Sequence, residues 1–67
     1  MDQLTERERE VMGLLKEGLS NAQIAKRLKI SMHTAKFHLE NALWKLDAKN
    51  RTHGAVIFAL AEQRAAS

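Results

Sequence analysis

The feature that most limits the fold of this chain is a series of helix starts in a sequence that contains no proline. Thr5 is followed three residues later by Glu8, and Ser20 by Gln23. At this spacing a hydroxyl can cap a helix while the acid or amide reaches back to the cap. Two more hydroxyl residues precede apolar helical segments, namely Ser31 and Thr52. No segment has the alternating pattern of a strand, so the sequence predicts an all-α fold.

Four helices are expected from these starts and from the apolar spacing, at about residues 5–17, 20–28, 31–46 and 52–64. Gly18 is expected to end the first, because glycine accepts the left-handed conformation that a helix end often needs. The second and third are only a few residues apart, with Ala25 where they must approach closely, which is typical of a helix-turn-helix. With 67 residues, we expect one compact domain over residues 1–67 and no second core for a substrate pocket.

The expected third helix has two chemically different faces. Its apolar positions recur at helical spacing and should face inward, at Ala35, Leu39, Ala42, Leu43 and Leu46. At about 100° per residue, Phe37 and Trp44 fall about 200° and 180° away from Ala35, so both should point outward. The other outward positions are His33, Lys36, Glu40 and Asn41. Donors, acceptors and apolar surface together suit base edges and thymine methyl groups in a DNA major groove.

Charge is unevenly distributed along the chain, whose formal net charge is +3. Residues 1–18 carry five acidic side chains against three basic ones, whereas residues 19–53 carry seven basic against two acidic. A basic middle segment suits a domain that lays one side on a polyanion, because neutralised phosphates release counterions.

Other classes of function have little support in this sequence. Without cysteine there is no disulfide and no thiolate metal site. His33 and His38 lie about 140° apart on a helix and do not converge with His53, so we expect no metal. The capping hydroxyls lack acid–base partners, so we expect neither an enzyme nor a cofactor. No apolar stretch approaches 18 residues and no secretory pattern begins the chain, which argues against a membrane and favours the cytoplasm.

The chain also resembles the LuxR-type (GerE-like) helix-turn-helix of bacterial transcription regulators, from about residue 4 to residue 61. The matching segments are LTEREREV at 4–11, GLSN at 18–21, IA at 24–25, Leu28, Ile30 and Ser31, TAKFH at 34–38, Asn41, and KL at 45–46. The resemblance implies a four-helix domain that binds double-stranded DNA, with the third helix in the major groove and the fourth mediating dimerisation.

The resemblance and the helical wheel together suggest roles for individual residues. Base-edge candidates are His33, Lys36, Phe37, Glu40 and Asn41, and phosphate candidates are Asn21, Ser31, Thr34, His38, Lys45 and Arg51. Four positions depart from the pattern of the family. Ala35 replaces a common valine, which removes buried methyl groups and should loosen the third helix slightly. Asp47 replaces a common glycine and should tolerate the same left-handed turn. Glu40 and Trp44 stand where basic or polar residues are frequent, so they bear on affinity and sequence preference.

The expected fourth helix is apolar on every side, with no polar side chain from Gly54 to Ala61. Such a helix should be covered on more than one side, most simply by its own copy in a weak homodimer. Alignment at four-residue spacing predicts that Val56 and Leu60 pack inward and that Ile57 and Ala61 face the partner. The predicted dimerisation residues are Ile57, Ala61 and Arg64.

Two alternatives remain open at this point. One is the promoter-binding region 4 of a sigma factor, which shares the helix-turn-helix core. The other is a protein-interaction module that docks a partner through the exposed Phe37 and Trp44 face. RNA polymerase or another regulator protein would be a further partner.

Overall fold

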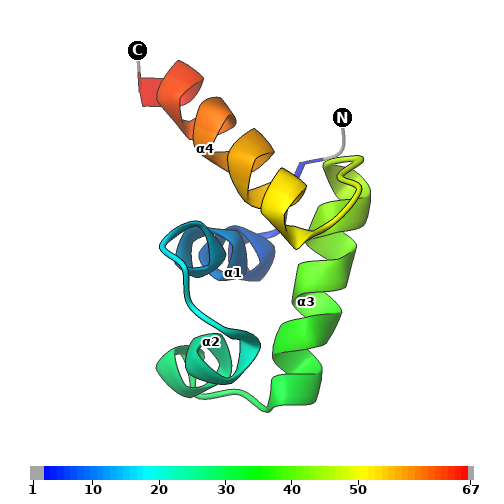
Figure 1. Cartoon of the computed structure of the whole chain (residues 1–67). Helices are drawn as coiled ribbons and strands as arrows, with labels where there is room; N and C mark the ends of the chain where they lie inside the picture. Colours follow the sequence, from blue (N-terminus) through cyan, green and yellow to red (C-terminus); the bar gives the residue numbers. More distant parts are fainter. Residues whose placement is uncertain (1–2, 67) are drawn as a thin grey trace.

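A computed structural model describes residues 3–66, which form four α-helices and, within that range, no strand. They are α1 (Glu6–Lys16), α2 (Asn21–Leu28), α3 (Met32–Lys45) and α4 (Arg51–Ala66). Each predicted boundary lies within two residues of the observed one, so the all-α prediction is confirmed. Figure 1 shows α1 between α2 and α4, with α3 running along one side of all three.

Both predicted capping boxes are present. The Thr5 backbone N–H donates to Glu8 Oε1 at 2.9 Å, and the Glu8 N–H donates back to Thr5 Oγ1 at 3.1 Å. At α2, the Ser20 N–H donates to Gln23 Oε1 at 2.8 Å and the Gln23 N–H to Ser20 Oγ at 3.2 Å. These bonds satisfy backbone groups that the first turn of a helix leaves unpaired.

The cap of α3 is the predicted one, but the cap of α4 is not. Ser31 Oγ accepts from the Thr34 N–H at 3.0 Å, as expected. At α4, Asn50 Oδ1 accepts from the His53 N–H at 2.8 Å, so Asn50 is the cap and Thr52 lies inside the first turn. Asparagine is as good a cap as threonine, and the helix therefore starts at the earlier of the two residues.

Three residues between the helices have positive φ: Gly18 at 95°, Lys29 at 59° and Asp47 at 55°. The sequence predicted this conformation for Gly18 and Asp47, but not for Lys29. Positive φ is unfavourable for a lysine, and the backbone hydrogen bonds at the C-terminal end of α2 offset this cost. Here the Lys29 N–H donates to Lys26 O at 3.3 Å and the Ile30 N–H to Ala25 O at 3.0 Å.

The core lies where α1 meets the other three helices. Its buried apolar side chains are Val11, Met12, Leu15, Ile24, Ala25, Ala35, Leu39, Ala42, Leu46 and Phe58. Helix α4 joins this core through Phe58 and buried Gly54. A β-carbon at Gly54 would collide with the end of the Leu43 side chain, which would have to shift to make room for it.

The predicted orientation of α4 is wrong. Val56 and Leu60, expected inside, are 52% and 53% exposed, whereas Ile57, expected toward a partner, is half-buried against the core. Phe58 supplies the physical reason. It is the largest apolar side chain of α4 and occupies the core, and at 100° per residue this turns Val56 and Leu60 about 160° away from it.

Candidate nucleic-acid interface

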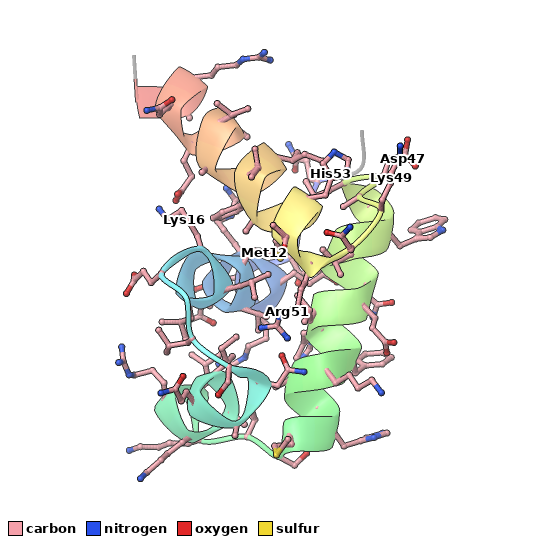
Figure 2. All side chains as sticks on the ribbon, in the orientation of Figure 1. Met12, Lys16, Asp47, Lys49, Arg51 and His53 are labelled. Carbon is pink, nitrogen blue, oxygen red and sulfur yellow. The ribbon has the colours of Figure 1, made fainter. Side chains whose placement is uncertain are left out.

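The outer face of α3 carries polar and aromatic side chains, as the wheel predicted. His33, Lys36, Phe37, Glu40 and Trp44 are all exposed. Trp44, at 75%, keeps most of its indole in solvent, and Phe37 is 57% exposed. Figure 2 shows the side chains along this face projecting away from α1 and α2. Asn41 is half-buried, so it lies at the edge of this face and not among its most exposed residues.

The charged groups on this face do not neutralise each other. Lys36 and Glu40 are one helical turn apart, but neither side chain makes a hydrogen bond or an ion pair with another of residues 3–66. One turn of α3 therefore offers a free ammonium donor and a free carboxylate acceptor. Beside them the Phe37 ring meets the half-buried His38 edge to face, with centroids 5.7 Å apart.

The N-terminal end of α3 is held by its own hydroxyls. Ser31 Oγ donates to Thr34 Oγ1 at 2.9 Å while it accepts from the Thr34 N–H. Ser31 is exposed and Thr34 half-buried, so both predicted phosphate candidates lie at the end of the helix that helix-turn-helix proteins direct toward DNA.

Arg51 links the start of α4 to the start of α2. Its Nη1 donates to Asn21 Oδ1 at 2.9 Å, and its Nη2 donates to Leu19 O at 3.3 Å. Figure 2 shows Arg51 pointing from α4 toward the centre of the molecule. The structure thus brings together two predicted phosphate candidates, Asn21 and Arg51, and fixes the guanidinium at the first turn of α2.

Lys45 lies in a different environment. Its Nζ donates to Glu8 Oε1 at 2.8 Å, and the Glu8 side chain is almost entirely buried. Burial raises the pKa of the Glu8 carboxyl, but hydrogen bonds from Lys45 and Thr5, with the charge of Lys45, outweigh it and lower the pKa below its ordinary value. Glu8 is therefore ionised at neutral pH. Its pair with Lys45 joins α1 to the C-terminal end of α3.

The exposed side of α4 forms a shallow groove lined by Lys16, Val56, Ala59, Leu60, Glu62 and Gln63. Lys16 and Glu62 form an ion pair that ties α1 to the C-terminal half of α4. Of the predicted dimerisation residues, Ala61 and Arg64 are exposed, but Ile57 packs against the core. Val56 and Leu60, which were predicted to pack inward, lie on the surface instead.

The three histidines do not come together as ligands of one metal ion. His53 Nδ1 accepts from the Lys49 N–H at 3.0 Å, which places this ring in the turn before α4. Among residues 3–66, no three His, Cys, Asp or Glu side chains come together as metal ligands. None of the four helices in this part of the chain has an apolar stretch that could span a lipid bilayer.

Comparison with known proteins gives consistent results. The family described as bacterial regulatory proteins, luxR family, matches residues 2–58. The monoamine regulon transcriptional regulator of Klebsiella aerogenes is 49% identical over 49 residues, which are 73% of this chain and 22% of that protein. The nitrate/nitrite response regulator protein NarP of Escherichia coli is 47% identical over 55 residues, 82% of this chain and 26% of that protein.

A solved structure, that of the response regulator ChrA in a heme-sensing two-component system, matches with a TM-score of 0.81. It is 39% identical, and the match covers 96% of this chain and 31% of that one. The chain thus spans about a quarter of the length of the curated relatives it matches. The family match favours the LuxR-type resemblance over the sigma-factor alternative.

Proposed function

The chain belongs to the luxR family of bacterial regulatory proteins, and on that premise we propose that it binds double-stranded DNA sequence-specifically and so regulates transcription. The observation that supports this most directly is the outer face of α3. Its donor, acceptor and aromatic side chains are exposed, and neither Lys36 nor Glu40 is tied to another of the described residues. A surface of this chemistry matches the edges of base pairs.

In this proposal α3 enters the major groove with its N-terminal half first. The proposed base contacts are His33, Lys36, Phe37, Glu40 and Asn41. Lys36 is suited to the acceptors of guanine, and the Phe37 ring to a thymine methyl group. Asn41 would contribute from the edge of the face, since it is half-buried.

The proposed phosphate contacts are Asn21, Ser31, Thr34, His38 and Arg51. Arg51 supports Asn21 and the first turn of α2, where backbone N–H groups favour an anion. We leave Lys45 out of this set, because its ammonium is held by the buried Glu8 carboxylate and would lose that contact on reaching for a phosphate.

We further propose that residues 1–67 form a single DNA-binding domain that acts by binding and not by catalysis, in the cytoplasm where bacterial DNA lies. A weak homodimer through α4 is also proposed, now through the groove around Val56 and Leu60. Val56 and Leu60 are exposed and one helical turn apart, so they offer a partner more apolar surface than Ile57, which is half-buried against the core.

The test is selection of bound duplexes from a random pool near physiological salt, followed by titration of the enriched duplex at several salt concentrations. We expect an enriched motif and binding that weakens steeply with salt, because phosphate contacts release counterions. Phe37→Ala should lose preference at one base pair while keeping the salt slope, since a ring contributes no charge. Absence of enrichment, together with salt-insensitive binding of a protein partner that Trp44→Ala abolishes, would favour the interaction module.

A further inference from the structure

Glu40 is an unexpected side chain on a DNA-binding surface. It is exposed on the outer face of α3, between Lys36 and Trp44 at four-residue spacing. Elsewhere in the described part of the chain, Glu8, Glu10 and Glu62 are held in ion pairs, whereas Glu6, Glu17 and Asp47, which lie off this face, are not. Glu40 has no such pair within residues 3–66.

An ionised carboxylate accepts hydrogen bonds but cannot donate them, and it is repelled by the phosphates that flank the groove. That repulsion is offset only where the carboxylate meets a donor. In the major groove the base donors are N4 of cytosine and N6 of adenine. Adenine N6 stands beside the acceptor N7, which repels the second carboxylate oxygen. Thymine O4 lies on the other side of adenine N6, whereas cytosine N4 has an acceptor on one side only, the O6 of its paired guanine, so cytosine is the better match.

We propose that Glu40 makes this domain require a cytosine at one position of each half-site, through a hydrogen bond from cytosine N4 to the carboxylate. The inference rests on the proposed DNA-binding function of α3. Glu40 also excludes guanine and thymine at this position, because these bases present acceptor oxygens to it.

Lys36 sets the position of that cytosine within the half-site. It precedes Glu40 by one turn, a rise of about 6 Å along the helix. Guanine O6 and N7 are the acceptors that suit a lysine. With base pairs about 3.4 Å apart, the guanine and the cytosine should lie no more than about two base pairs from each other.

The experiment is duplex selection with the wild-type chain, Glu40→Gln and Glu40→Ala in parallel, followed by titration of synthetic duplexes that differ at one base pair. The wild type should enrich cytosine and lose at least about fivefold in affinity when that base is changed. Glu40→Gln should move the preference to adenine at the same position, because glutamine both donates and accepts and so pairs with N6 and N7. Glu40→Ala should abolish the base preference at that position and leave the preferences at the other positions unchanged.

Glu17→Gln is the matched control, because it removes the same charge from an exposed residue at the end of α1. It should leave the motif unchanged. The proposal is overturned if all the chains enrich the same motif, or if both Glu40 variants raise affinity equally on every sequence, which would make Glu40 only a repulsive charge. Failure of the wild type to enrich any duplex would instead overturn the proposed function, and this inference with it.

Discussion

The pair between Glu8 and Lys45 can be tested by the substitution Glu8→Gln. Glutamine keeps a carbonyl oxygen that can accept from the Thr5 N–H, so the capping box can survive while the charge is removed. What is lost is the ion pair between α1 and the end of α3. Glu8→Ala removes both interactions, and the difference between the two variants isolates the contribution of the cap.

The expected size of the effect follows from the burial of each partner. Breaking a fully buried pair costs about 3–5 kcal/mol. The Glu8 side chain is 5% exposed, but that of Lys45 is 22% exposed, so its ammonium can recover part of its hydration. We therefore expect Glu8→Gln to lower the free energy of unfolding by about 1.5–3 kcal/mol. That corresponds to a fall in Tm of roughly 6–24 °C in so small a domain.

The pH dependence of this difference has a definite sign. Because folding lowers the pKa of Glu8, ionised Glu8 stabilises the fold above the pKa that this carboxyl has in the unfolded chain, about 4.5. That stability is lost as the pH falls through the lower pKa of the folded state. Chemical denaturation followed by circular dichroism, from pH 7 down to pH 3, should therefore show wild type and Glu8→Gln converging at the acid end.

Two results would refute this reasoning. Equal stability of wild type and Glu8→Gln at pH 7 would mean that desolvation of Glu8 cancels its attraction to Lys45. A difference that stays constant down to pH 3 would mean that the glutamine is destabilising for another reason, such as poorer packing. Lys45→Met in both backgrounds completes a double-mutant cycle that measures the coupling directly.

Three further outcomes are expected. Lys36→Ala should weaken binding to the selected duplex by about 1–3 kcal/mol in titrations, and a loss that is equal on all sequences would assign Lys36 to a phosphate. Leu60→Asp should leave thermal unfolding nearly unchanged but weaken binding to paired half-sites. Ile57→Ala should destabilise the fold by about 1–3 kcal/mol in thermal melts. The reverse pattern would mean that Leu60, and not Ile57, packs inward. Gly18→Ala should destabilise by about 1 kcal/mol in denaturant titrations, because φ is 95° there, and an unchanged midpoint would contradict this.

The parts of the fold that could be predicted are those decided locally. The caps at Thr5 and Ser20 depend on residues three positions apart, so a short segment contains all the information they need. The outer face of α3 was predictable for a related reason. Its small and aliphatic residues from Ala35 to Leu46 occupy one side, so the wheel has a clear direction that puts Phe37 and Trp44 outside.

The parts that failed depend on distant contacts. Helix α4 is apolar on every side from Gly54 to Ala61, so its periodicity has no direction, and the side that is buried is set by the packing of Phe58 into the core. The pair of Glu8 with Lys45 joins residues 37 positions apart. The sequence near each residue already explains it, Glu8 as part of a capping box and Lys45 as a surface cation, so nothing in the sequence indicates that the two meet. Phe58 is the largest apolar side chain of α4, and its size is the sequence signal that indicates the buried face of that helix.

The arrangement of the two exposed surfaces bears on how self-association and DNA binding are related. The α4 groove is lined in part by Lys16, which Figure 2 shows on the side of α1 away from α3. A second copy seated in that groove therefore leaves the outer face of α3 uncovered in both protomers. Docking of one α3 and pairing of two chains should then be separable by substitution. It follows that Leu60→Asp should spare binding to a single half-site while reducing the advantage of two half-sites on one duplex. Equal losses on both duplexes would show that Leu60 acts through the fold of one chain.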